Sequence, residues 1–171
     1  MKGYVQVYTG DGKGKTTAAL GLALRAAGAG LNVYFAQFVK GMQSSEIESV
    51  KKLSDQITIR QYGNASFINV TPREEDISAA RKGLAEAREA MLSGKYQVII
   101  LDEANIATNY DLFSAEDLLD LIRLKPDDVE LIITGRYADQ RIIEAADLVT
   151  EMKDIKHYYR NGISARDGIE K

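Results

Sequence analysis

The sequence has 171 residues and a net charge of −3, and 45% of its residues are hydrophobic while 27% are charged. These values are typical of one globular domain, residues 1–171, with a core large enough to fold without disulfides or a metal. Because there is no cysteine, no strongly basic balance and no apolar run of roughly 20 residues, the composition excludes thiolate chemistry and indicates neither a nucleic-acid partner nor a membrane span.

Six apolar runs along the chain predict β-strands. The first run begins near the N-terminus without a signal sequence, so we expect a cytoplasmic protein. The predicted strands are Tyr4–Gly10, Asn32–Gly41, Ile57–Gly63, Gln97–Ala104, Val129–Arg136 and Asp147–Lys153. The fourth and fifth contain the uninterrupted stretches "VIIL" and "LIIT", which are typical of central parallel strands buried on both faces.

Helix signals occur in three of the segments between the strands. The alanine- and leucine-rich stretch "TTAALGLALRAAG" continues directly from a glycine-rich loop. The second helix is predicted to have Thr71 as its N-cap, Pro72 in its first position and Glu74 completing a capping box. The third has Ser114 as its predicted N-cap and Asp117 at the capping-box position. This alternation predicts an α/β fold, a three-layer α/β/α domain with a mostly parallel central sheet.

The stretch "YTGDGKGKTT", Tyr8–Thr17, joins the first strand to the first helix and predicts a phosphate-binding loop. Its three alternate glycines allow backbone N–H groups to face an anion, which the helix N-terminus also favours. Lys15 supplies a mobile positive charge and Thr16 a hydroxyl group for Mg²⁺. Thr9 stands where the usual pattern has its first glycine. The loop indicates a P-loop (RecA-like) domain, the alternative being a glycine-rich turn that contains a lysine.

Acidic and basic residues follow the predicted central strands. Asp102 and Glu103 come directly after "VIIL", so at the carboxyl edge of the sheet one of them could hold Mg²⁺, although a solvated acidic turn is the alternative. Arg136 ends the next strand and could reach a triphosphate or form a surface salt bridge. Lys13 is predicted to point at phosphate or solvent, and Arg25, within the first helix, resembles an ordinary surface arginine.

Four long stretches of the sequence resemble one enzyme family, the ATP:corrinoid adenosyltransferases of the CobA/BtuR type. They are "TGDGKGKTTAALGLALRAAGAGLNVYFAQFVKG", "VIILDEAN", "LIITGRYAD" and "ADLVTEMKDIKHYYRNGISARDGIE". The resemblance runs from Tyr4 to Glu170. Its most specific parts are the threonine at the head of the loop, the "QFVKG" strand end and the closing "KH…GI.A..GIE" segment, so Thr9 is a residue that the resemblance predicts.

The resemblance implies an unusual reaction of ATP. A reduced corrinoid, with its cobalt as Co(I), would attack C5′ of the ribose and expel the triphosphate, forming adenosylcobalamin or a related adenosylcorrinoid. It implies ATP and cobalamin or another corrinoid as substrates, Mg²⁺ as the cofactor and a reduced flavoprotein as the electron donor. It also favours a homodimer, since most such oligomers are closed and two-fold.

The resemblance also assigns roles to individual residues. The loop residues predicted to bind the triphosphate are Thr9, Gly10, Asp11, Gly12, Lys13, Gly14, Lys15, Thr16 and Thr17. Those predicted to act in catalysis are Lys15, Thr16 and Glu103. Thr16 and Glu103 would also hold the metal, with Asp102 supporting them, while Arg25 and Arg136 would contact the nucleotide.

An aromatic wall against the corrinoid is the last feature that the resemblance implies. It would displace the lower ligand of the cobalt and come from "QYGNASF", with Phe67 the leading candidate and Tyr62 the next. Ordinary core packing of Phe67 is the alternative. Because the first strand starts at about Tyr4, we expect the N-terminal segment that often covers the active site of relatives to be absent.

Two other functions are compatible with the loop. A kinase or ATPase would transfer the γ-phosphoryl group and yield ADP, whereas a nucleotide-binding switch would yield ADP slowly or not at all. An adenosyltransferase would instead yield triphosphate. The single histidine, His157, has no second histidine for a metal pair, so a hydrogen-bonded structural role is predicted for it.

Overall fold

A computed structural model describes residues 2–39, 45–52, 55–63 and 72–170 of the chain. All six predicted strands are present, and they form one parallel sheet in the order β3-β2-β4-β5-β1-β6. The strands are β1 (Val5–Thr9), β2 (Val33–Phe38), β3 (Ile57–Tyr62), β4 (Val98–Asp102), β5 (Glu130–Thr134) and β6 (Leu148–Glu151). The two uninterrupted apolar strands, β4 and β5, lie at the centre of the sheet as predicted.

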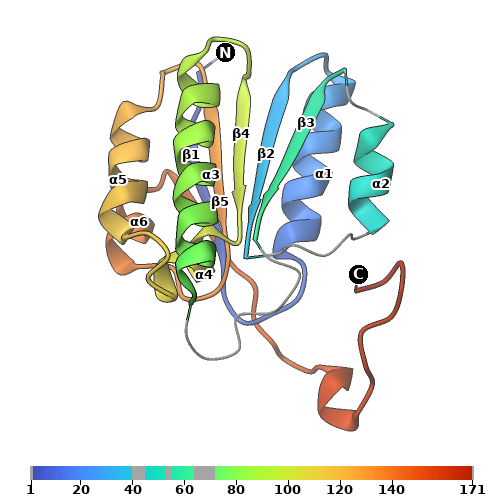
Figure 1. The fold of residues 1–171 in the computed structure, drawn as a ribbon. Coiled ribbons are helices and arrows are strands. Elements are labelled where there is room, and N and C mark those ends of the chain that lie inside the picture. Colours follow the sequence, from blue (N-terminus) through green and yellow to red (C-terminus); the bar gives the residue numbers. More distant parts are fainter. Residues whose placement is uncertain (1, 40–44, 53–54, 64–71, 171) are drawn as a thin grey trace.

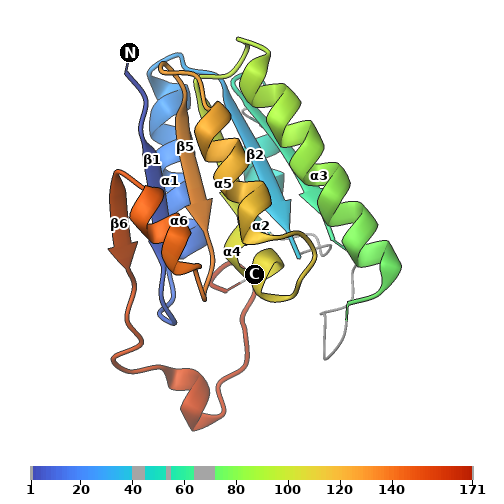
Figure 2. The ribbon, with the colours of Figure 1, turned by 90° about the vertical axis from the view of Figure 1, so that its left-hand side faces the viewer.

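Helices cover both faces of the sheet (Figures 1 and 2), so the predicted three-layer α/β/α architecture is confirmed. One face packs against α1 and α2, and the other against α3, α4, α5 and α6. The helices are α1 (Lys15–Gly28), α2 (Ser45–Lys51), α3 (Glu74–Leu92), α4 (Ala104–Asn109), α5 (Ala115–Leu124), α6 (Gln140–Ala145) and the short 3₁₀ helix η1 (Tyr158–Asn161). In the described part of the chain, no helix has the length and apolarity needed to cross a membrane.

The sheet separates two hydrophobic cores. Along β4, Ile99 and Leu101 face the core under α3 and α5, whereas Val98 and Ile100 face the core under α1. Because alternate side chains of a strand point to opposite faces, a strand covered on both sides must be apolar at every position. The burial of both faces therefore explains the uninterrupted run that the sequence displays.

The N-terminus of α5 forms as predicted. The Asp117 amide donates to Oγ of Ser114 at 3.2 Å, and the Ser114 amide donates to the Asp117 carboxylate at 2.7 Å. This reciprocal pair satisfies two amides that the helix itself cannot use. The short helices α2, α4 and α6 are not indicated by the sequence patterns, since each has only six or seven residues.

The predicted start of α3 is wrong. The helix begins at Glu74 with Arg73 as its N-cap, so Pro72 precedes the helix, and Thr71 lies outside the described residues. The Arg73 amide donates to the carboxylate of Asp76 at 3.0 Å. Glu74 and Asp76 are both acidic residues whose carboxylate could accept from the capping residue. In the structure, Asp76 is the acceptor.

Helix α3 packs on β3 through a glycine. A methyl group added at Gly83 would lie 2.6 Å from Cδ2 of Tyr62, so we expect Gly83→Ala to lower the free energy of unfolding by about 1–3 kcal/mol. Gly21, in α1, has no described atom near enough to clash with an added methyl group. Gly21→Ala should therefore raise the free energy of unfolding by about 0.5–1 kcal/mol. Urea denaturation of both variants measures this difference, and two effects of the same sign would contradict the packing.

Candidate functional site

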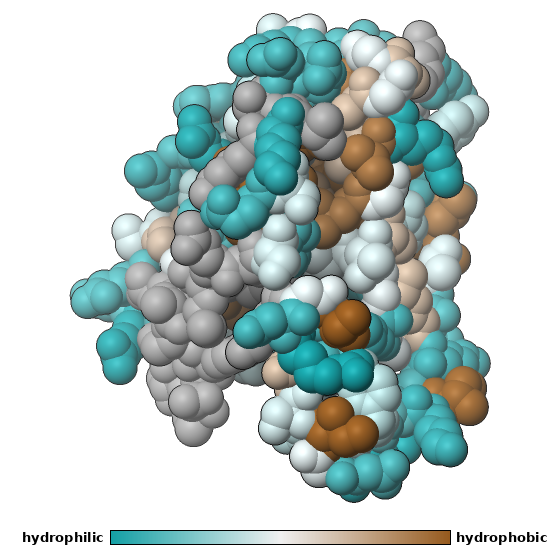
Figure 3. All heavy atoms as spheres, turned by 90° about the vertical axis from the view of Figure 1, so that its right-hand side faces the viewer, coloured by the Kyte–Doolittle hydropathy of each residue, from teal (hydrophilic) through white to brown (hydrophobic). Residues whose placement is uncertain are grey.

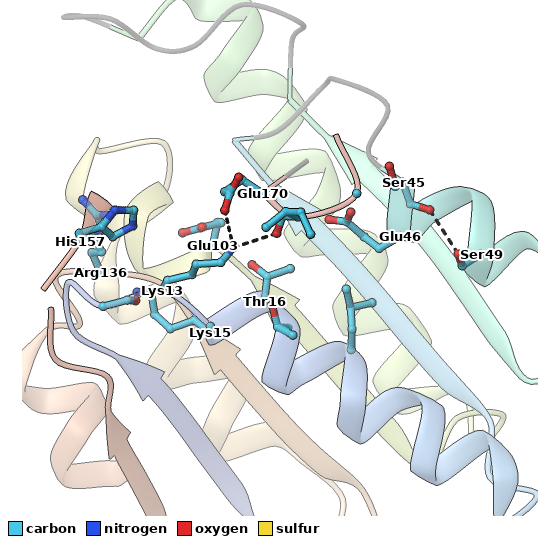
Figure 4. Close-up of a pocket in the computed structure, with 16 residues that line it drawn as sticks. Lys13, Lys15, Thr16, Ser45, Glu46, Ser49, Glu103, Arg136, His157 and Glu170 are labelled. Atoms are coloured by element: carbon cyan, nitrogen blue, oxygen red, sulfur yellow. Dashed lines mark hydrogen bonds and ion pairs between the residues drawn. The ribbon is translucent and has the colours of Figure 1, made fainter. Parts of the chain in front are cut away.

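A cavity of about 600 Å³ lies at the carboxyl edge of the sheet. Its floor is the loop between β1 and α1, and its walls come from the ends of β4 and β5, from α2 and from the C-terminal segment (Figure 4). The carboxyl ends of parallel strands meet at one edge, which is where ligands bind in open α/β sheets. The fold therefore brings most of the predicted site residues together.

The glycines of the loop are required by its shape. Gly10 and Gly14 have φ angles of 91° and 120°, which favour glycine. The chain after β6 also lies against the loop: the Gly12 amide donates to the Met152 carbonyl at 2.6 Å, and a Cβ atom at Gly12 would lie 2.7 Å from that oxygen. The Gly12 amide is thus bonded within the protein, whereas the sequence predicted that it faces an anion.

Lys15 lies under the loop and bridges it. Its side chain belongs to a residue only 7% exposed, and Nζ donates to the carbonyls of Gly10 and Gly12 at 2.6 Å each. Burial lowers the pKa of the Lys15 ammonium, while the negative charge of Glu103 raises it and Arg136 lowers it. The two hydrogen bonds place Nζ of Lys15 at the centre of the loop.

Asp102 is fully buried and is the centre of a polar network. Its carboxylate accepts hydrogen bonds from Thr134 Oγ1 at 2.7 Å, Gln37 Nε2 at 2.9 Å and Thr16 Oγ1 at 3.2 Å. Gln37 and Thr134 were missed by sequence reasoning. The available signal is that each is a polar residue near the end of an otherwise apolar central strand, where burial requires a hydrogen-bond partner.

Glu103 lines the cavity next to this network. Its backbone has φ = 60°, a left-handed conformation that costs a non-glycine residue roughly 1–2 kcal/mol. The Glu103 amide donates to Thr134 Oγ1 at 3.0 Å, which helps to hold the turn into α4. Backbone strain of this kind often occurs at functional sites. The turn carries the Glu103 carboxyl to the cavity while Asp102 stays inside.

Three further nitrogen-bearing side chains line one end of the cavity: Lys13, Arg136 and His157 (Figure 4). Lys13 Nζ donates to the Ile169 carbonyl at 3.0 Å and lies 3.9 Å from the Glu170 carboxylate. With Lys15 beneath them, Lys13 and Arg136 make this the cationic end of the cavity, where an anion such as a phosphate chain would be favoured.

The C-terminal segment forms the outer wall beside this end. Hydrogen bonds from Arg166 and then Tyr158 lower the pKa of Glu170 to about 2, so the carboxylate is charged at neutral pH.

Seen from the α2 side, the lower part of the molecule shows separate hydrophobic patches among hydrophilic residues (Figure 3). The exposed apolar residues of the C-terminal segment are Ile155, Tyr159, Ile163 and Ile169.

The opposite end of the cavity was not predicted. Leu20 of α1 and Ser45, Glu46 and Ser49 of α2 line it, and Ser49 Oγ donates to the Ser45 carbonyl at 3.3 Å. Because α2 is short and polar, no periodic pattern marked it in the sequence. The cavity thus has a cationic end and an end lined by hydroxyl groups, the Glu46 carboxyl group and one leucine.

The remaining predicted loop residues lie at the site. Thr17 lines the cavity, whereas the Asp11 side chain is exposed. Thr9 is buried, and its hydroxyl accepts a hydrogen bond from the Ala138 amide at 3.5 Å. This contact connects the head of the loop to the segment after β5. It gives a structural role to a threonine where the usual loop pattern has a glycine.

Thr9, Gly10, Asp11 and Asp102 lie next to the cavity without lining it, Arg25 and Tyr62 do not line it either, and Phe67 lies outside the described residues. Arg25 is exposed in the last turn of α1, about 15 Å along the helix axis from Lys15. Tyr62 is only 7% exposed, and its hydroxyl bonds to Tyr34, at 2.6 Å, and to Glu86. Burial raises the pKa of the Tyr62 hydroxyl. Phe67 falls in the range 64–71, which is not described.

The site offers hard oxygen ligands of the kind that Mg²⁺ prefers. No group of three or more His, Cys, Asp or Glu side chains in the described ranges could hold a metal by itself. Thr16 Oγ1 and the Asp102 carboxylate lie 3.2 Å apart, and Glu103 follows directly. A metal that also binds phosphate oxygens needs only such a partial set from the protein. The residues present therefore fit Mg²⁺.

The sequence from residue 1 to 170 matches the model of a family described as ATP:corrinoid adenosyltransferase BtuR/CobO/CobP. The chain belongs to this family. It is 36% identical over 172 residues to a corrinoid adenosyltransferase of a Sinorhizobium species, covering 99% of this chain and 80% of that one. Over 170 residues it is 32% identical to a corrinoid adenosyltransferase of Pseudomonas aeruginosa, covering 99% and 84%. It is 31% identical over 169 residues to one from Escherichia coli (strain K12), covering 99% and 86%.

The fold of this adenosyltransferase family member is also similar to a solved structure. The crystal structure of the flagellar accessory protein FlaH from Methanocaldococcus jannaschii aligns with a TM-score of 0.62 and 14% sequence identity, covering 88% of this chain and 71% of that chain. At this identity the likeness concerns the fold alone. It agrees with the α/β/α architecture that the sequence predicted.

Proposed function

We propose that this adenosyltransferase moves the 5′-deoxyadenosyl group of ATP to the Co(I) of a reduced corrinoid. The electron pair of Co(I) forms a bond to C5′ of the ribose. The bond between C5′ and the α-phosphate oxygen breaks, and its electron pair leaves with the triphosphate. The products are an adenosylcorrinoid, such as adenosylcobalamin, and triphosphate. The observation that carries this proposal is the family match from residue 1 to 170.

The residues of the cationic end act on the leaving group. Because Co(I) is already a strong nucleophile, the reaction needs no general base, and catalysis lies in stabilising the charge that develops on the triphosphate. Lys15 holds its ammonium at the centre of the loop, while Lys13 and Arg136 line the cavity beside it. Holding C5′ in line with the cobalt supplies a further part of the rate. These roles for Lys13, Lys15 and Arg136 are part of the proposal.

We further propose that Mg²⁺ accompanies the ATP. Thr16 and Glu103 would hold it, and the buried Asp102 would orient the Thr16 hydroxyl through the 3.2 Å contact. The metal would supply positive charge to the phosphate oxygens. In the cavity, Glu103 is the carboxylate that a turn of left-handed backbone directs outward.

The partners follow from the same reaction. We propose that a reduced flavoprotein supplies the electron that makes Co(I), that the enzyme works as a homodimer, and that it acts in the cytoplasm, where ATP and reduced flavins meet. A bulky, partly apolar corrinoid needs a large enclosing surface, which a second subunit would help to provide. Roles for Arg25 at the nucleotide and for Phe67 and Tyr62 at the corrinoid stay predictions.

Product analysis tests the proposal. Purified protein, ATP, Mg²⁺ and chemically reduced cobalamin are mixed without oxygen, and both products are identified by chromatography. We expect adenosylcobalamin and triphosphate in equal amounts. ADP and phosphate with unchanged cobalamin would overturn the proposal and favour a kinase or ATPase. Omitting the reductant is the control, since Co(II) lacks the electron pair that the reaction requires.

A further inference from the structure

His157 lies at the site although its sequence context predicted only a structural role. It lines the same cavity as Lys13, Lys15 and Arg136, and Figure 4 shows its ring at the cationic end beside Arg136. The residue is the N-cap of η1, in the segment that follows β6. A side chain that caps a short helix and also faces a phosphate-binding cavity can have two functions, one for each ring nitrogen.

One ring nitrogen has an assigned partner. Nδ1 of His157 accepts a hydrogen bond from the Tyr159 amide at 3.1 Å. A neutral imidazole that accepts at Nδ1 carries its proton at Nε2, so this bond fixes the tautomer. Within the described residues, no hydrogen bond or ion pair uses Nε2. The cap therefore leaves the Nε2–H group as a donor for the cavity.

Aromatic neighbours fix the orientation of the ring. The rings of Tyr158 and His157 have centroids 4.8 Å apart, and the Tyr159 ring lies edge-on at 6.5 Å with an interplanar angle of 86°. The Tyr158 hydroxyl in turn contacts Glu170, which also lines the cavity. The imidazole is thus held by its backbone bond and by two rings before any ligand enters.

We propose that His157 is a phosphate-binding residue, whose Nε2–H donates a hydrogen bond to the phosphate chain of ATP and of the triphosphate product. This inference rests on the proposed function. The Nε2–H group adds a directed hydrogen-bond donor at an end where Lys13, Lys15 and Arg136 lie together with the carboxylates of Glu103 and Glu170.

Two substitutions of His157 test the functions of its two ring nitrogens separately. In His157→Asn the amide oxygen takes the place of Nδ1 and can still accept from the Tyr159 amide, but the donor at Nε2 is lost. In His157→Gln the amide nitrogen takes the place of Nε2, while the cap is lost. The measurement is the dissociation constant of inorganic tripolyphosphate with Mg²⁺, by titration calorimetry. We expect His157→Asn to weaken binding about tenfold or more and His157→Gln to stay within about threefold of the unchanged protein.

A nearby lysine provides the matched control. Lys156 is exposed and is not among the residues that line the cavity, so Lys156→Ala should leave the affinity for tripolyphosphate unchanged. Thermal melts establish that each variant is folded. Loss of binding in His157→Gln but not in His157→Asn would overturn the inference and leave His157 only a cap. So would equal affinities in both variants.

The adenosyl-transfer reaction and the phosphate-binding role of His157 can be refuted separately. The tripolyphosphate titration needs no corrinoid and no reductant, so it tests His157 without the cobalt chemistry. If the unchanged protein forms adenosylcobalamin and His157→Asn still binds tripolyphosphate normally, the role of His157 is refuted and the function stands. If the product analysis yields ADP, the function is refuted whatever the titration gives.

Discussion

Lys15→Ala is expected to slow adenosyl transfer by at least about a hundredfold. The Lys15 ammonium is buried under the loop and bonded to the carbonyls of Gly10 and Gly12, so no neighbouring side chain can take its place. In the proposed reaction it faces the negative charge that the triphosphate gains as the C5′–O bond breaks. The initial rate of adenosylcobalamin formation, with reduced cobalamin in excess, measures the effect.

A second lysine near the loop is the control for this experiment. The Lys153 side chain is 68% exposed and pairs with Glu151 at 3.5 Å, although its backbone lies against Gly12. Lys153→Ala removes a positive charge close to the loop but leaves Lys15 in place beneath it. The rate of adenosyl transfer should therefore stay within about twofold of that of the unchanged protein, as for most surface substitutions. Equal losses in both variants would mean that general attraction of ATP, and not the buried ammonium, controls the rate.

Asp102→Ala is expected to damage both stability and activity. The substitution leaves the buried donors of Thr134 and Gln37, and the part-buried hydroxyl of Thr16, without their acceptor. Each unsatisfied buried donor costs about 1–3 kcal/mol, and after partial relaxation we expect a total loss of about 3–4 kcal/mol in the free energy of unfolding. Urea denaturation measures the loss. Adenosyl transfer should fall below detection, because the Thr16 hydroxyl loses its orientation.

Glu103→Gln separates activity from stability at the neighbouring position. The substitution keeps the size of the side chain and removes its charge, so the free energy of unfolding should change by less than about 0.5 kcal/mol. The rate of adenosyl transfer should nevertheless fall about a hundredfold if Glu103 holds Mg²⁺, and the Mg²⁺ concentration for half-maximal rate should rise. A normal Mg²⁺ dependence in Glu103→Gln would refute the proposed metal role.

The sequence predicted the parts of the site that are formed by residues close together in the chain, or by the strand ends of a parallel sheet. Uninterrupted apolar strands located the centre of the sheet, and a strand followed by glycines and then Lys15 located the loop. Asp102 and Glu103 were placed correctly because the carboxyl ends of parallel strands share an edge. In each case neighbours in the sequence are neighbours in space, or the rules of parallel sheets connect them.

Contacts between distant segments were not predictable in the same way. Nothing near Gln37 in the sequence indicates that its amide reaches Asp102, which lies beside it on the adjacent strand β4. Nothing near Tyr62 in the sequence indicates that its ring packs against Gly83 of α3 inside the core. His157 lines the same cavity as Lys13 because of the way the chain returns after β6, and no local pattern determines that return.

The contact between Gly12 and Met152 has a consequence for the making of the protein. The loop leaves the ribosome early, but the carbonyl that bonds it belongs to a segment synthesised roughly 140 residues later. Strand β1 itself pairs only with β5 and β6, so it has no strand partner until most of the chain exists. A nascent chain therefore carries the loop sequence for most of its synthesis without its finished shape. We therefore expect ATP binding to begin only after the segment around Met152 has been made, so that a stalled product would not compete for the nucleotide.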